Sequence, residues 1–281
     1  RVMGWGSNGY GQLGDGTTTS PRSWPVAAQG ITTAAQIDAG QSHALAVLAD
    51  GTVRTWGYNN AGHSNNPPNT YVQVTASDMH TCAMRANGWL ECWGSNASGQ
   101  SVPPTGEFAQ VNAGGSFNCA LRLNGAVQCW GSNLRGQLNS PAGVFSQISS
   151  GDFHSCAISQ AGTLTCWGDN MYGQSTVPTP TQLYRQVSAS VGSHTCALTL
   201  GGQAQCWGYN LAGQATAPAG TFVQVSAGVG HSCAIRADGT IACWGANTYG
   251  QSTPPIGRFT RVTAGFNKTC AWRAEGGLTC F

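Results

Sequence analysis

Twelve cysteines, arranged in six pairs, are the residues of this 281-residue chain whose spacing first suggests chemistry. The two members of each pair are ten residues apart and none is left over: Cys82 and Cys92, Cys119 and Cys129, Cys156 and Cys166, Cys196 and Cys206, Cys233 and Cys243, Cys270 and Cys280. Thiols bind metals or form disulfides, but zinc sites usually have Cys-x2–4-Cys spacing. The ten-residue spacing therefore predicts six disulfides, each within its own repeat, and no metal site.

The residues between paired cysteines predict how the thiols are brought together. A turn signal such as Asn87-Gly88 or Asp238-Gly239 lies between them, and the flanking residues alternate in polarity. Asn-Gly and Asp-Gly favour tight hairpins, because both central residues of a type I′ turn need positive φ. Each pair is therefore expected on two antiparallel strands, nearly opposite one another, where neighbours are about 4.5–5.5 Å apart. In the one repeat without a pair, Leu45 and Thr55 take these positions.

Histidine recurs two positions before the first cysteine position of most repeats. It is found at His43, His80, His154, His194 and His231, while Phe117 and Lys268 replace it in the other two repeats. Five histidines could bind a metal or act as a pH switch. Because the position repeats along the chain, we expect instead a hydrogen bond to local backbone in each repeat.

The elements that carry these residues follow a longer period. The dipeptide Trp-Gly recurs at intervals of 51, 37, 37, 37, 40 and 37 residues, beginning at Trp5, Trp56, Trp93, Trp130, Trp167, Trp207 and Trp244. Each repeat has four strand-like pieces: A (as in 71–74, 108–111 and 222–225), B and C with the two cysteine positions, and D after Gly-Gln (as in 99–100). This pattern predicts an all-β fold, a seven-bladed β-propeller of four-stranded antiparallel blades with one hairpin disulfide in six of the blades.

The domain prediction is a single propeller over 1–281. Its repeat units run roughly over 1–56, 57–93, 94–130, 131–167, 168–207, 208–244 and 245–281. The Trp-Gly tryptophans are expected in the core between blades. The pattern contains eight C pieces but seven of every other type, so either 1–6 or 278–281 is surplus. The surplus strand could complete the last blade or pair with a neighbouring molecule.

Composition excludes several classes of function. Only 8% of residues are charged, the net charge is +2, and there is no basic run, so we expect no nucleic-acid partner. No apolar stretch reaches the roughly 18 residues of a membrane span, so we expect no membrane insertion. Six disulfides favour an extracellular or cell-surface location, and the periplasm also fits. No catalytic motif is present among the ten carboxylates and the paired thiols, so we expect neither an enzyme nor a cofactor.

The repeated motif also supports a family resemblance. Gly-x-x-His-x-Cys-Ala-Ile at 228–235, followed by Asp-Gly-x-x-x-Cys-Trp-Gly-x-Asn-x-x-Gly-Gln at 238–251, resembles the regulator-of-chromosome-condensation repeat. The first unit is similar to the long form of that repeat, and later units are similar to compact repeats of secreted bacterial members, including a propeller-type β-lactamase inhibitor. The resemblance covers essentially the whole chain and implies a seven-bladed propeller. It implies less about function, because members include a chromatin-binding nucleotide-exchange factor and enzyme inhibitors.

The most variable loops are the candidate binding site. In antiparallel strands the A–B and C–D loops share one face, and the B–C turns lie on the other. The Asn that recurs in every C–D loop is expected to form a local turn. The predicted binding face consists of Tyr10, Tyr58, Asp78, Met79, Phe117, Arg135, Asp152, Phe153, Asp169, Met171, Tyr172, Tyr209, Tyr249 and Phe266, with Leu134 and Leu211 as further variable positions. Alternatively, these side chains pack on their own blades.

The resulting hypothesis is a secreted, non-enzymatic scaffold that recognises a protein or glycan through variable loops on one propeller face. One alternative is a structural subunit of an extracellular filament or surface layer, with self-association through terminal strands. Another is an inhibitor of a secreted or periplasmic enzyme. Asn96 and Asn267 lie in glycosylation sequons, whose use depends on the source of the protein.

Overall fold

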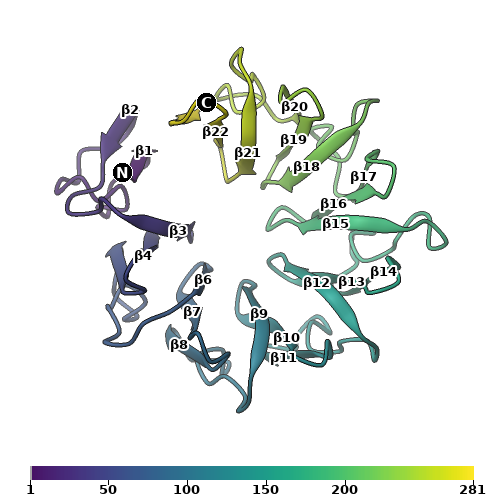
Figure 1. The fold of residues 1–281 in the computed structure, drawn as a ribbon, viewed down its shortest axis with the longest axis horizontal. Helices are drawn as coiled ribbons and strands as arrows, with labels where there is room; N and C mark the ends of the chain where they lie inside the picture. Colours follow the sequence, from purple (N-terminus) through teal and green to yellow (C-terminus); the bar gives the residue numbers. More distant parts are fainter. Residues whose placement is uncertain (1) are drawn as a thin grey trace. The chain divides into compact units, whose positions relative to one another are not determined.

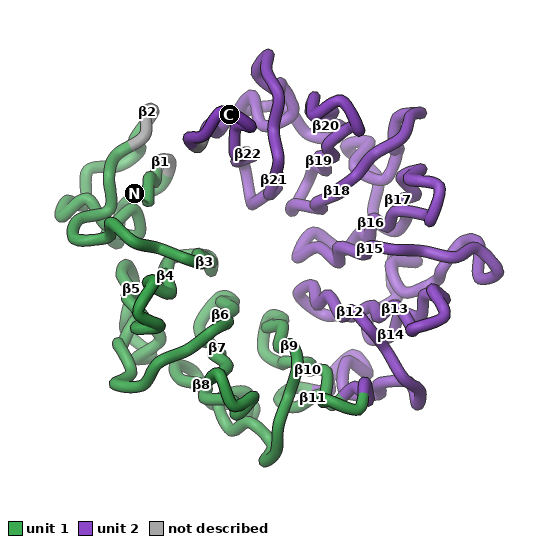
Figure 2. The backbone as a smooth tube through the Cα atoms, in the orientation of Figure 1, with its two compact units in different colours: residues 1–124, 128–132 green, residues 125–127, 133–281 purple. Residues whose placement is uncertain are grey.

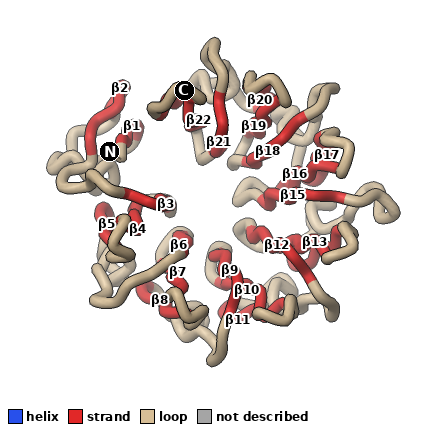
Figure 3. Tube along the Cα trace, viewed as in Figure 1, coloured by secondary structure: helices blue, strands red, loops and turns tan. Residues whose placement is uncertain are grey.

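The computed structural model describes residues 2–281, which consist of strands, turns and loops without a helix (Figures 1 and 3). They form one two-stranded and seven three-stranded antiparallel sheets. The all-β prediction is therefore confirmed. The described residues hold no helix of the length and apolarity that a membrane crossing requires.

The chain divides into two compact units, coloured separately in Figure 2. Unit 1 ends at residue 124 and also includes 128–132. Its strands are β1 (Met3–Gly6), β2 (Arg22–Ala27), β3 (Ala34–Ala39), β4 (His43–Leu48), β5 (Val53–Gly57), β6 (Gln73–Ala76), β7 (His80–Met84), β8 (Leu90–Gly94), β9 (Phe108–Ala113), β10 (Phe117–Arg122) and most of β11 (Val127–Gly131).

Unit 2 comprises residues 125–127 and 133–281. Its strands are β12 (Phe145–Ser150), β13 (His154–Ser159), β14 (Leu164–Gly168), β15 (Tyr184–Ala189), β16 (His194–Thr199), β17 (Ala204–Gly208), β18 (Phe222–Ala227), β19 (His231–Arg236), β20 (Ile241–Gly245), β21 (Phe259–Ala264), β22 (Thr269–Arg273) and β23 (Leu278–Cys280). In every three-stranded sheet the middle strand is the one that carries the first cysteine position.

All six predicted disulfides are present, each across a hairpin within its own repeat. Their Cα atoms are 4.0–4.1 Å apart, and the paired cysteines lie directly opposite in the ladder, as Cys156 does to Cys166. Leu45 and Thr55 oppose each other in the same way in the repeat without cysteines. The described residues contain no free cysteine.

The predicted fourth strand is wrong for the later repeats, because the sheets have three strands. The segment after Gly99-Gln100 shows the reason: Pro103 and Pro104 lack the backbone N–H that a ladder needs, and Gly106 turns the chain with a φ of +116°. In the first repeat, the piece after Gly11-Gln12 does form a strand: β2 follows a longer loop and pairs with β1. Residue 1, which the sequence placed in the surplus strand, lies outside the described residues.

The core lies between neighbouring sheets of each unit. One cluster in unit 2 joins Cys156, Ile158 and Leu164 of one sheet to Tyr184 and Val187 of the next. Tryptophans close these clusters, as predicted: Trp130, Trp167, Trp207 and Trp244 are buried, and Trp56 and Trp93 are half-buried. The side chain of Trp5 lies outside the described part of the chain.

Neighbouring sheets are also joined by a repeated chain of polar contacts. In unit 2, Nε2 of His154 lies 2.8 Å from Oγ1 of Thr195, and this hydroxyl donates to the main-chain oxygen of Gln174 at 3.0 Å. The indole N–H of Trp207 donates to the same oxygen at 2.9 Å. Because the hydroxyl proton goes to Gln174, the hydroxyl oxygen accepts from the His154 ring, which therefore carries its proton on Nε2.

This arrangement corrects the prediction for the histidines. Their Nε2 atoms contact a side chain of the next repeat, rather than local backbone, at 2.7–3.0 Å; the pairs are His43–Thr81, His80–Asn118, His154–Thr195, His194–Ser232 and His231–Thr269. The physical reason is that this position of the middle strand faces the adjacent sheet, where a hydroxyl or amide follows the next histidine position. One repeat's sequence does not contain that partner.

The hydroxyl of Thr195 is therefore expected to contribute to stability. Thr195→Val leaves the buried His154 N–H without an acceptor, which costs about 1–3 kcal/mol. Urea unfolding measures this change in the free energy of unfolding. Thr165→Val, at an exposed position of β14, is the matched control and should change it by less than about 0.5 kcal/mol. Equal effects of the two substitutions would contradict the proposed role of the hydroxyl.

Burial of the histidines also predicts acid sensitivity. Burial lowers the pKa of His194 to about 3, well below the value of about 6.5 in an unfolded chain, and the neighbouring histidines add to this shift. The lowered pKa of the folded state means that the free energy of unfolding is highest above pH 6.5 and decreases as the pH falls from 6.5 toward 3.

For His194 the loss amounts to about 2 kcal/mol at pH 5. We therefore expect His194→Gln to reduce the difference in unfolding free energy between pH 7.5 and pH 5 by about that amount. Urea titrations at the two pH values measure the difference. An unchanged pH dependence in the variant would show that His194 does not stay neutral in the folded protein.

Candidate binding face

The A–B and C–D loops lie at the same end of each sheet. The N–H of the residue after six of the seven Trp-Gly dipeptides donates to a carbonyl of the A–B loop, as from Asp169 to Phe153 at 2.8 Å and from Tyr209 to Ser193 at 2.9 Å. The predicted sharing of one end by the two kinds of loop is therefore present in these six sheets. The B–C turns lie at the opposite end.

Side chains of the repeated Asn and Gln hold each C–D loop in shape. In the loop after β14, Oδ1 of Asn170 accepts the N–H of Ser175 at 2.9 Å, and Oε1 of Gln174 accepts the N–H of Tyr172 at 2.9 Å. The expected local bond of the Asn occurs in all seven loops, at Asn8, Asn59, Asn96, Asn133, Asn170, Asn210 and Asn247. The two residues after each Asn are thereby held at the loop tip.

The loop tips of unit 2 carry large apolar side chains that are open to solvent. Directly after the Asn, Leu134 is 90% exposed, Met171 64% and Leu211 85%. The same position in unit 1 holds Gly9, Asn60 and Ala97. Exposed apolar side chains at equivalent positions of three successive repeats have no role in the packing of their own sheets, so they are candidates for contact with a partner.

Several predicted site residues contact one another between successive loops. In unit 2, the rings of Tyr172 and Tyr209 meet edge to face with centroids 4.9 Å apart, and Nη1 of Arg135 lies 3.6 Å from Oδ1 of Asp169. In unit 1, Tyr10 meets Tyr58 in the same way at 4.7 Å. These contacts connect neighbouring loops.

The other predicted residues differ in exposure. Large parts of their side chains are open to solvent at Met79, Phe153, Tyr249 and Phe266, whereas Asp78 and Asp152 are half-buried. Burial also raises the pKa of the Asp78 carboxyl.

Phe117 is a correction to the predicted face. Its side chain is fully buried, because it takes the histidine position at the start of β10 and points into the sheet packing. Phe117 therefore cannot contact a partner.

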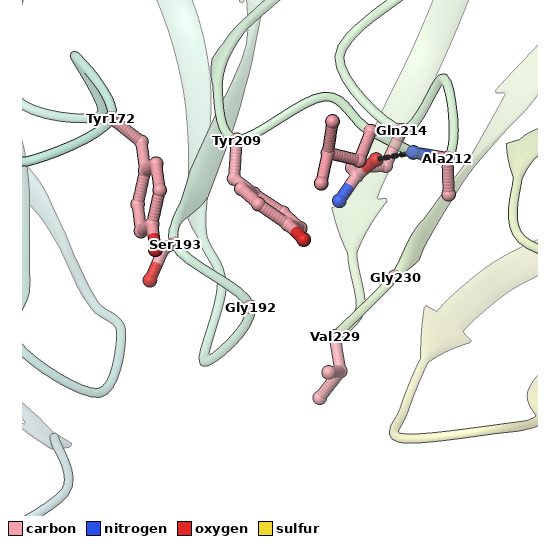
Figure 4. A pocket seen from close by; sticks show the side chains of 9 residues that line it. Tyr172, Gly192, Ser193, Tyr209, Ala212, Gln214, Val229 and Gly230 are labelled. Carbon is pink, nitrogen blue, oxygen red and sulfur yellow. Dashed lines mark hydrogen bonds between the residues drawn. The ribbon is translucent and has the colours of Figure 1, made fainter.

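A hollow of about 450 Å³ lies beside the two tyrosines in unit 2 (Figure 4). Its lining includes Tyr172, Ser193, Tyr209, Gln214 and Val229, together with Leu211, Ala212 and two glycines. No charged side chain lines it. The tyrosines and Leu211 were predicted from the sequence as variable loop residues, whereas Ser193, Gln214 and Val229 were not predicted as site residues.

A signal for part of this hollow was present in the sequence. The interval from Trp167 to Trp207 is 40 residues instead of 37, and one of the extra residues lies in the A–B loop between β15 and β16. In that loop Ser193 has a φ of 60°, the one positive value among the described non-glycine residues. Oγ of Ser190 accepts the N–H groups of Gly192 and His194 at 3.1 and 3.2 Å, which stabilises the altered loop.

A metal site requires several ligating side chains that lie close together. Between residues 2 and 281, no three His, Cys, Asp or Glu side chains gather closely enough to hold a metal ion. The five repeated histidines are buried and bonded between sheets.

Comparison with solved structures identifies the fold as a β-propeller. The ectodomain of the receptor kinase CR4 from Physcomitrella patens is 26% identical and matches 87% of this chain and 72% of its own, with a TM-score of 0.72. The CRINKLY WD40 ectodomain of the Arabidopsis thaliana receptor kinase ACR4 is 24% identical over 89% and 97%, with a TM-score of 0.69. Prp20p from Saccharomyces cerevisiae is 18% identical over 96% and 90%, with a TM-score of 0.78.

Family comparison agrees with the motif. One family model described as the regulator of chromosome condensation (RCC1) repeat matches residues 34–62, 108–137, 145–174, 184–214 and 222–251. A second model of the same description matches 1–47. The matches cover more than half of the chain and confirm the resemblance seen in its repeated Gly-Gln, Trp-Gly and histidine positions. The chain belongs to the regulator of chromosome condensation (RCC1) repeat family.

Proposed function

We propose that this chain is an extracellular, non-enzymatic scaffold that binds a protein through the loop face of unit 2. We define this face as the tips Leu134, Met171 and Leu211 with the adjoining Tyr172 and Tyr209. The observation that carries the proposal is the exposure of three large apolar side chains at equivalent positions of successive repeats. Interfaces are enriched in Met and aromatic residues, which this face supplies.

The extracellular location rests on the six disulfides. Disulfides persist in oxidising compartments and are rare in the cytosol and nucleus. The similarity to ectodomains of two plant receptor kinases is consistent with this location. A nuclear role like that suggested by the family name fits poorly, because the chain has a net charge of only +2 and almost no lysine.

A protein partner accounts for the chemistry of the face better than a glycan. Leu134, Met171 and Leu211 offer dispersion and hydrophobic contact but no hydrogen bonds, whereas sugars present many hydroxyl groups. Solved relatives support protein binding in the family, since Prp20p has been studied for binding to Gsp1p and histones. An inhibitor of a secreted enzyme would be one case of such a protein-binding scaffold.

The loops also have a low entropic cost of binding. Asn170 and Gln174 each fix backbone N–H groups of their loop, and the contact between Tyr172 and Tyr209 connects it to the next loop. Little conformational freedom is therefore lost when a partner binds, which favours affinity at a given contact area.

A triple variant tests the proposal. The partner is captured from the secreted proteins of the cells that produce this chain. Leu134→Ser, Met171→Ser and Leu211→Ser together should reduce this capture at least tenfold, because each side chain contributes on the order of 1 kcal/mol or more to the binding free energy. Quantitative mass spectrometry of captured proteins, after cross-linking, measures the effect.

The control removes three exposed apolar side chains of unit 2 that lie outside the A–B and C–D loops. Leu200→Ser, Val223→Ser and Ile256→Ser should leave capture unchanged. Equal capture by the two triple variants would contradict a binding role for the loop face. The thermal stability of both should stay close to that of the parent, because none of the six side chains is buried.

A second candidate function is assembly into a filament. It is favoured by the two-stranded sheet β1–β2, in which each strand is paired on one side among the described residues, because a strand of another molecule can add to such an edge. Light scattering after size-exclusion chromatography separates the two functions. The binding scaffold predicts a monomer of 29.0 kDa, whereas an open-ended series of oligomers would favour assembly.

A further inference from the structure

The hollow beside the loop tips carries a more specific assignment. We propose that it is an anchor pocket for a neutral, apolar side chain of the protein partner, and that the side-chain amide of Gln214 donates to a main-chain carbonyl oxygen beside that side chain. This inference rests on the proposed function, because it specifies what the loop face of unit 2 recognises.

The side-chain amide of Gln214 uses only its oxygen in hydrogen bonds within the described part of the protein. Gln214 is 1% exposed, and its Oε1 accepts the N–H of Ala212 at 2.9 Å. Its Nε2 has no acceptor among the described residues and faces the hollow in Figure 4. A partner that supplies an acceptor there adds a hydrogen bond that the protein does not make by itself.

The equivalent Gln amide is bonded within the loop in three other repeats. It donates there to the side chain two residues after the Trp, and the pairs are Gln12–Ser7, Gln100–Ser95 and Gln174–Asp169, whereas Gln137 and Gln251 make no such bond among the described residues. In the repeat of Gln214 this residue is Tyr209, whose hydroxyl lies at the far end of its ring. Tyr209 therefore offers the amide no nearby oxygen, and its ring forms a wall of the hollow.

Two glycines help to shape the hollow. Gly192 and Gly230 lie in its lining, and a Cβ at Gly192 would come within 1.6 Å of the main-chain oxygen of Val229. The glycine therefore lets two loops approach more closely than any side chain would permit. Tyr172, Tyr209 and Val229 complete a lining with rings and aliphatic groups around the amide.

The lining selects the chemistry of the occupant. A charged group would lose its hydration without meeting an opposite charge, because the hollow has no charged side chain. A neutral apolar side chain gains contact with Tyr209 and Val229. The adjacent main-chain carbonyl is a neutral acceptor of the kind that the Gln214 amide needs. Anchors of this type often dominate the binding energy of protein interfaces.

The test uses small amides as probes. N-acetyl-leucinamide and N-acetyl-phenylalaninamide are titrated into the ¹⁵N-labelled full chain at pH 8, and the side-chain amide signal of Gln214 is followed by NMR. We expect saturable shifts at millimolar concentrations with both probes. N-acetyl-lysinamide and N-acetyl-aspartamide with a free side-chain carboxylate should bind at least fivefold more weakly, because their charges find no partner.

Matched variants identify the donor. Gln214→Glu keeps the oxygen that accepts the Ala212 N–H but removes the donor, so the affinity for the neutral probes should fall at least fivefold. Gln251→Glu is the control, because Gln251 accepts the N–H of Tyr249 in the same way and lies outside the lining. Tyr209→Ala, compared with Tyr249→Ala, tests the pocket independently if Gln214→Glu disturbs folding.

Three outcomes would overturn the proposal. These are equal binding of charged and neutral amides, no saturation by either neutral amide, and saturation by methyl β-glucoside alone, which would assign the hollow to a glycan. The proposed function fails separately, because it depends on partner capture by the Leu134, Met171 and Leu211 variant. If capture is lost in that variant while no amide binds, the protein-binding face stands and the anchor pocket is wrong.

Discussion

One main-chain carbonyl oxygen in each C–D loop connects that loop to the next sheet. In unit 2 the oxygen of Gln174 accepts both the indole N–H of Trp207 and the hydroxyl of Thr195, and that hydroxyl accepts from His154. Two donors on one buried oxygen fix the position of a loop that has no ladder bonds of its own. Because tryptophan also closes the apolar cluster between sheets, the same residue couples hydrophobic packing to the placement of the loop.

This coupling explains how a chain so rich in glycine can present defined loops. The side-chain oxygens of Asn170 and Gln174 accept backbone N–H groups within the loop. The main-chain carbonyl of Gln174 joins the loop to the next sheet. The residues between them, Met171 and Tyr172, carry none of these bonds through their side chains. They can therefore vary between repeats without cost to the fold, whereas the Asn, Gln and Trp positions stay nearly constant along this sequence.

The sequence predicts features that depend on contacts within one repeat. Cysteines ten residues apart around an Asn-Gly or Asp-Gly turn determine the strand register, so the disulfides follow directly. Features that depend on the neighbouring repeat were less accessible. The partner of His154 is 41 residues away at Thr195, so nothing near the histidine identifies it. Phe117 looked like a loop aromatic but fills the buried histidine position. The fourth strand failed because prolines such as Pro103 remove the donors that it needs.

The candidate anchor pocket arises where one repeat departs from the others. An extra residue in the A–B loop places Ser193 in the left-handed region, which is costly for a non-glycine residue and is stabilised by Ser190. In the same repeat, Tyr209 takes the position of the short polar residue that accepts the Gln amide of Gln12, Gln100 and Gln174. The altered loop and the amide both border one hollow, beside exposed Leu211. This is why we propose recognition at this place, because the amide faces the hollow with its hydrogen-bonding capacity unused among the described residues.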